Sequence, residues 1–125
     1  MARTIQEPLF VPQTEWVMPD ELKDLSHYDE VAIDLETCDP QLKELGSGNV
    51  VGRGHIAGIG IAVEGWQGYF PIGHSQGINL DKNLIKGWLQ DICKREDKTF
   101  IFHNAMYDVC WLRSFGIEIK GKIVD

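Results

Sequence analysis

The segment that most constrains this chain covers residues 31–37, Val-Ala-Ile-Asp-Leu-Glu-Thr, in which apolar and polar side chains alternate. Alternation of this kind predicts a β-strand with one face in the core. Because neighbouring side chains on a strand point to opposite faces, Asp34 and Glu36 share the other face, with Cα atoms about 6.5 Å apart. Two such carboxylates repel each other unless a cation lies between them, and Mg²⁺ and Mn²⁺ prefer carboxylate ligands.

A third carboxylate follows a short apolar segment at residues 99–102. Asn104 is expected to begin the next helix, and Asp108 lies four residues later on the same helix face. Three carboxylates around two metal ions about 3.5–4 Å apart suit the attack of a metal-bound water on a phosphodiester. Each piece alone has a simpler explanation, because a strand can carry a solvated face, Asn is a common helix cap and Asp is favoured near a helix start.

The remaining pattern predicts an α/β fold. A short helix is expected at residues 19–22, within a lead-in segment that covers residues 1–27, and a long polar loop at residues 38–54. Further strands are expected at 55–63, 69–72, 99–102 and 117–124, a turn at 64–68, and helices at 79–95 and 105–115. The apolar stripe expected on the first long helix consists of Leu84, Ile85, Trp88, Leu89 and Ile92.

Composition limits the class of protein. A chain of 125 residues fits one domain, has no apolar run long enough to span a membrane and begins with no secretory signal sequence. The three cysteines, Cys38, Cys93 and Cys110, lack C-x-x-C spacing, so neither a disulfide framework nor a zinc site is expected. The absence of a disulfide framework predicts an intracellular location. The net charge of -7 argues against tight binding of nucleic acid by these residues alone.

Two motifs carry a resemblance to a known family. Residues 34–37, Asp-Leu-Glu-Thr, and residues 103–108, His-Asn-Ala-Met-Tyr-Asp, resemble the first two motifs of the DEDD 3′–5′ exonucleases. The strongest similarity is to the proofreading domain of family A DNA polymerases, the bacterial DNA polymerase I type and its phage relatives. Residues 56–62, 69–74 and 115–125 also look like that family, so the resemblance covers about residue 28 to the end.

The resemblance implies a ribonuclease H-like mixed β-sheet with flanking helices, in which residues 28–125 are part of a 3′–5′ exonuclease domain and the family's C-terminal helices are missing. It implies that Asp34, Glu36 and Asp108 are catalytic and bind two Mg²⁺ or Mn²⁺ ions. The expected location becomes the cytoplasm of a bacterial or phage-infected cell.

The resemblance also implies that Thr37, Asn104 and Tyr107 contact the 3′ end of single-stranded DNA. The family's third motif, Tyr-x-x-x-Asp, has no match in these 125 residues, and Asp125 aligns with an Asp that precedes it rather than with the motif itself. We therefore expect the chain alone to be inactive or nearly so. A polymerase module in cis, or a complementary downstream chain, is expected to supply basic surface for DNA.

Two alternatives remain open from the sequence. An exoribonuclease of the ribonuclease D kind shares both motifs, although residues 69–74, Tyr-Phe-Pro-Ile-Gly-His, look like the polymerase branch. A non-catalytic interaction module with the same fold would bind metal equally well after replacement of Asp34 or Asp108 by Ala.

Overall fold

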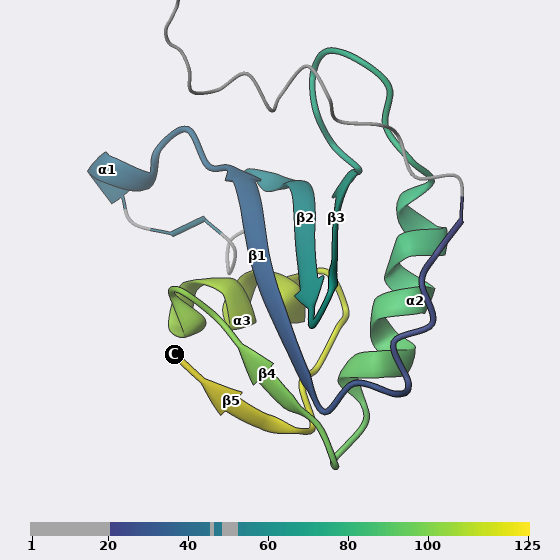
Figure 1. Ribbon diagram of the computed structural model, residues 1–125. Coiled ribbons are helices and arrows are strands. Elements are labelled where there is room, and N and C mark those ends of the chain that lie inside the picture. The colour runs from purple at the N-terminus through teal and green to yellow at the C-terminus, as the bar shows by residue number, and fades with distance from the viewer. Residues whose placement is uncertain (1–20, 46, 49–52) are drawn as a thin grey trace, which may run out of the picture.

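The computed structural model describes residues 21–45, 47–48 and 53–125, which form an α/β fold (Figure 1). The elements in chain order are β1 (Glu30–Cys38), α1 (Leu42–Leu45), β2 (His55–Val63), β3 (Trp66–Pro71), α2 (Lys82–Cys93), β4 (Thr99–Ile101), α3 (Ala105–Ser114) and β5 (Lys122–Val124). The five strands make one mixed sheet flanked by helices, so the predicted fold class is confirmed, and the arrangement is compatible with a ribonuclease H-like fold.

The sheet has the strand order β3-β2-β1-β4-β5, with β1 at its centre. β1 runs antiparallel to β2 and parallel to β4. Its pairing with β4 covers Glu30 to Ala32, whereas its pairing with β2 continues to Cys38. The acidic half of β1 therefore lies beyond the end of β4, where α3 follows.

The core lies on the face of β1 that carries Val31 and Ile33, which are 0% and 2% exposed. This is the face predicted from the alternation. Both long helices contribute to the same hydrophobic cluster, α2 with Leu89 and α3 with Leu112. The other face of the sheet carries Ala32, beside a hollow lined in part by residues of β2 and β4. The acidic residues of β1 are thus held on a packed strand while their side chains stay outside the core.

The β2–β3 hairpin is tighter than the sequence suggests. Val63 pairs with Trp66, so Glu64 and Gly65 alone form the turn, and β3 begins at Trp66 rather than at residue 69. Gly65 has φ +80°, the left-handed conformation that favours glycine in two-residue hairpin turns. The expectation of a turn over residues 64–68 was wrong. Pro71 ends β3, which is an edge strand, as proline in a sheet requires.

Other expectations also need correction. The stripe on α2 holds for Ile85, Leu89 and Ile92, but Leu84 is 60% exposed because the buried face turns toward Cys93 instead. The long loop contains the short helix α1. The last strand is limited to β5, because the backbone N–H groups of Ile117 and Lys120 donate to Leu112 and Cys93 rather than to a strand.

Residues 22–25, near the end of the lead-in segment, form no helix, and residues 19 and 20 of the expected helix lie outside the described part of the chain. Trp88 Nε1 donates to the Lys23 carbonyl at 2.8 Å. The buried Lys98 ammonium donates to the Ser26 carbonyl at 2.9 Å and also to that of Tyr28. Among the described helices, none is long and apolar enough to cross a membrane.

Candidate metal and nucleic-acid site

The strand β1 places Asp34 and Glu36 on the face opposite the core, and both are exposed. Their partners across the ladder are glycines, with Asp34 opposite Gly60 and Glu36 opposite Gly58. A Cβ added at Gly60 would have only Asp34 within 4 Å, so the face around this carboxylate is open. The predicted sharing of one face by the two carboxylates is confirmed.

Asp108 approaches the same region from the first turn of α3, and it is 4% exposed. Burial, followed by the charge of Asp34, raises its pKa to about 6, although a hydrogen bond from the Leu35 backbone N–H acts in the opposite direction. The N–H of Leu35 belongs to the part of β1 that β4 no longer pairs. Two carboxylates from separate elements are therefore close enough to repel each other.

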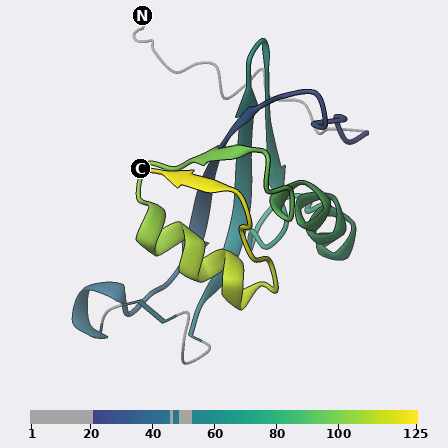
Figure 2. The same cartoon turned by 90° about the horizontal axis from the view of Figure 1, so that it is seen from below.

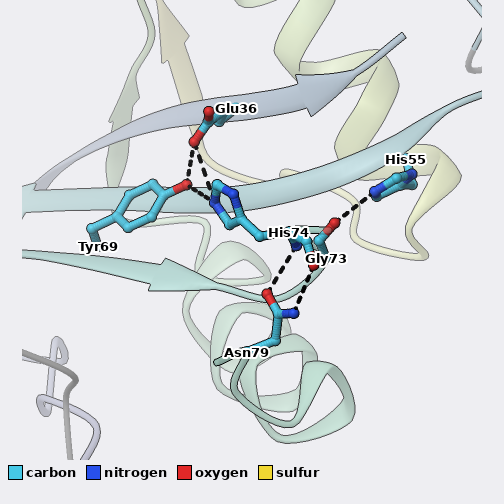
Figure 3. A network of polar contacts seen from close by, with 6 residues as sticks. All are labelled: Glu36, His55, Tyr69, Gly73, His74 and Asn79. Atoms are coloured by element: carbon cyan, nitrogen blue, oxygen red, sulfur yellow. Dashed lines mark hydrogen bonds and ion pairs between the residues drawn. The ribbon is translucent and has the colours of Figure 1, made fainter. Parts of the chain in front are cut away.

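Glu36 lies in a different environment, which Figure 3 shows. The Tyr69 hydroxyl donates to Glu36 Oε1, and His74 Nε2 lies 2.7 Å from the Tyr69 hydroxyl and 3.4 Å from the same Oε1. Burial, followed by the hydrogen bond and the charge of Glu36, raises the pKa of Tyr69 above its ordinary value. Tyr69 is therefore neutral and remains a hydrogen-bond donor to Glu36.

The donors present suit a divalent cation in part. No group of three or more His, Cys, Asp or Glu side chains within residues 21–45, 47–48 and 53–125 is arranged to hold a metal ion. Asp34 and Asp108 offer the oxygen ligands that Mg²⁺ and Mn²⁺ prefer, and a cation between them would relieve the repulsion that raises the pKa of Asp108. Glu36 shares their face but is engaged by Tyr69 and His74.

Two of the three residues expected to contact DNA meet directly. The hydroxyls of Thr37 and Tyr107 are 2.7 Å apart, which joins the end of β1 to the first turn of α3. The Tyr107 ring also lies 6.2 Å from that of Trp111. Asn104 occupies the N-cap position, as predicted, but its exposed side chain makes no capping hydrogen bond.

Asp125 supplies the capping contact instead. Its Oδ1 accepts a hydrogen bond of 3.2 Å from the Ala105 backbone N–H, and Figures 1 and 2 both show the chain end beside the start of α3. The charge of Asp125 also contributes to the raised pKa of Asp108. Asp125 thus acts at the start of the helix that carries Asp108, a role that the sequence did not suggest.

No profile of a known protein family matches the chain. The DNA-directed DNA polymerase of Pseudomonas phage M6 is 38% identical over 124 residues. This chain is homologous to a segment of a DNA polymerase. The alignment covers 93% of the chain and 18% of the polymerase, so the chain spans about a fifth of that relative's length.

Sequence reasoning missed Tyr69 and His74 as neighbours of Glu36. The available signal was the pair of glycines in β2, because a strand that places Gly58 and Gly60 on one face leaves room for a large side chain from the next strand. Two histidines near this site make hydrogen bonds, since His55 Nε2 donates to the Gly73 carbonyl at 2.7 Å and His74 contacts Tyr69.

Proposed function

We propose that this chain is part of the 3′–5′ exonuclease domain of a DNA polymerase, which removes the 3′-terminal nucleotide of single-stranded DNA with two Mg²⁺ or Mn²⁺ ions. The observation that carries the proposal is the Asp34–Asp108 pair, in which a buried carboxylate with a pKa of about 6 faces a second carboxylate. Perturbed carboxylates of this kind gather at functional sites. The homology to a DNA polymerase supports DNA as the substrate.

In this proposal Asp34 and Asp108 hold the cations, and Glu36 is the third ligand. The cations, when bound, supply a nucleophilic water at neutral pH and stabilise the entering and leaving oxygens. Thr37 and Tyr107 contact the terminal nucleotide as one unit, because their hydroxyls are hydrogen-bonded to each other. Asn104 is exposed at the start of α3 and offers its amide to the same nucleotide.

The 125 residues contain no Tyr-x-x-x-Asp, so the proposed domain includes further residues that lie elsewhere in a polymerase. We expect the chain alone to cleave DNA at least ~10²-fold more slowly than a complete domain, because small displacements of reacting groups cost that much. With its net charge of -7, it should also bind single-stranded DNA weakly without metal. Submicromolar binding without metal would contradict the second expectation.

A chimeric polymerase tests the proposal. The chain would replace the stretch of the phage M6 polymerase to which it aligns. We expect Mg²⁺-dependent release of nucleotides from the 3′ end of a 5′-labelled DNA strand, and loss of this release after Asp34→Ala or Asp108→Ala. Asp91→Ala, at an exposed position on α2, is the matched control and should leave the release unchanged. A chimera that still extends primers but releases no 3′ nucleotides would overturn the proposal.

The same protein distinguishes the two alternatives. An exoribonuclease would degrade a labelled RNA strand faster than a DNA strand of the same sequence. A non-catalytic module would bind Mn²⁺ equally well with and without the Asp34→Ala and Asp108→Ala substitutions. The proposal predicts the opposite result in both measurements.

A further inference from the structure

We propose that Tyr69 and His74 are positioning residues that hold one oxygen of Glu36, so that its other oxygen is presented to a divalent cation. This inference rests on the proposed function, in which Glu36 is a metal ligand. Neither residue needs to touch the cation or the DNA. They would act by fixing the side chain that does.

The direction of the hydrogen bonds follows from counting protons. Glu36, as a carboxylate, can only accept, so the single hydroxyl proton of Tyr69 is used in the bond to Oε1. The Tyr69 oxygen must then accept from His74, whose Nε2 at 2.7 Å therefore carries a proton. The result is a chain of donors that runs from His74 through Tyr69 to Glu36.

Both contacts fall on one carboxylate oxygen. Tyr69 and His74 each approach Oε1, and Figure 3 shows the second oxygen of Glu36 turned away from them. Oε2 makes no hydrogen bond within the described part of the chain. A carboxylate held in this way is fixed in orientation and still has an oxygen free for a metal ion, which is the usual arrangement of partners behind metal ligands.

The segment that carries His74 is itself fixed by its backbone. The Asn79 side chain bonds both the N–H and the C=O of His74, each at 2.9 Å. The N–H groups of Ile72 and Gly73 donate to the Ala57 carbonyl at 2.9 and 3.0 Å. Position 74 is therefore tied to β2 and to the loop before α2, which limits movement of the imidazole away from Tyr69.

The path of Tyr69 to Glu36 depends on Gly58. A Cβ at this position would lie 1.8 Å from the Tyr69 hydroxyl oxygen and 2.3 Å from its Cζ, so any other residue would displace the ring. Tyr69 pairs with Gly60, and Glu36 pairs with Gly58, so the phenol crosses diagonally over β2. The glycine, the tyrosine and the histidine thus form one built support for Glu36.

Mn²⁺ titration of the 125-residue chain by calorimetry tests the inference. Loss of such a supporting partner weakens metal binding by about 10–100-fold, so we expect Tyr69→Phe to act at the lower end and Tyr69→Phe with His74→Ala at the upper end. His74→Gln keeps an N–H donor and should retain most of the affinity. In a Glu36→Gln background, Tyr69→Phe should cause no further loss, whereas a merely structural role would add its full effect.

Two conservative substitutions outside the network serve as controls. His27→Gln, at the end of the lead-in segment, and Tyr28→Phe, directly after it, should leave Mn²⁺ affinity unchanged. Thermal unfolding followed by circular dichroism identifies the variants that fold. If the variant with His74→Ala does not fold, the Mn²⁺ affinity of Tyr69→Phe compared with the unsubstituted chain still tests the inference. Unchanged or tighter Mn²⁺ binding by folded Tyr69→Phe, with binding still abolished by Asp34→Asn, overturns this inference alone. Absence of Mn²⁺ binding in the unsubstituted chain overturns it together with the proposed function.

Discussion

Glu36 and Asp108 lie at the same end of β1 but in opposite environments. Glu36 is exposed and receives a hydrogen bond from a neutral side chain, with a histidine behind it. Asp108 is buried beside a second carboxylate, and its pKa is raised to about 6. The fold therefore satisfies one carboxylate with its own donors and leaves the other with a repulsion that a cation could relieve. In the proposed site, Glu36 is thus the carboxylate that the fold already positions, and Asp34 and Asp108 are the pair that a cation would stabilise.

The largest expected effect concerns Asp34 and Asp108, the two carboxylates that repel each other. Asp108→Asn should weaken Mn²⁺ binding by more than the roughly 10–100-fold that the loss of a supporting partner costs, because the charge of a proposed metal ligand is removed. Tyr69→Phe, on the other side of β1, should stay within that range. Calorimetric titration of both variants measures the contrast. Equal losses in the two variants would break the distinction between the two environments.

The next effect is a pH dependence of stability without metal. Because the pKa of folded Asp108 is raised from 3.8 to about 6, this residue makes folding most favourable below 3.8, and the gain is lost as pH rises through about 6. Near pH 7, Asp108→Asn should therefore increase the free energy of unfolding by about 1–3 kcal/mol. Urea unfolding at acidic and neutral pH measures this. Glu36→Gln should not increase the free energy of unfolding in this way. An increase equal to that of Asp108→Asn would show that the two carboxylates do not lie in different environments.

Gly58→Ala tests the support of Glu36 by Tyr69 through a steric change alone. The new methyl group would meet the Tyr69 phenol, so we expect a loss of about 1–3 kcal/mol in stability, the usual cost of overpacking. Mn²⁺ affinity should fall as it does for Tyr69→Phe. Gly87→Ala, on α2, has nothing within 4 Å of the added Cβ and is the control. A Gly58→Ala protein with the stability and Mn²⁺ affinity of the unsubstituted chain would show that Gly58 does not determine the position of the Tyr69 ring.

The smallest effect is expected at the link between β1 and α3. Tyr107→Phe removes the 2.7 Å hydrogen bond to Thr37 and should cost about 0.5–1.5 kcal/mol of stability. Mn²⁺ affinity should change little, because the two hydroxyls bond each other and not one of the three carboxylates. Thermal unfolding and the same titration measure both quantities. A large loss of metal affinity would show that this link, rather than the packing of α3, sets the position of Asp108.

The positions of Asp34, Glu36 and Asp108 on their strand and helix were predictable because they depend on local periodicity. The alternation in β1 and the four-residue spacing from Asn104 to Asp108 place their side chains without knowledge of distant contacts. The partners of Glu36 depend on register instead. A turn over residues 64–68 would place Tyr69 at the start of its strand, whereas the observed two-residue turn pairs it with Gly60. A difference of three residues in one hairpin decides whether Tyr69 reaches Glu36.

The contact of Asp125 with α3 was equally hidden from the sequence. A helix cap is expected from the residue just before the helix, which here is Asn104. The carboxylate that bonds the Ala105 N–H comes instead from a position twenty residues later, directly after β5. Contacts of this kind follow from the pairing of β5 with β4, which no local pattern encodes.

The central claim is that a divalent cation relieves the repulsion between Asp34 and Asp108. The most direct test is a ¹³C NMR titration of the Asp108 carboxyl in the 125-residue chain, with and without Mg²⁺. The expected pKa is about 6 without metal, and it should fall to the ordinary 3.8 or below when Mg²⁺ is bound. A pKa that is the same with and without saturating Mg²⁺ would contradict the account.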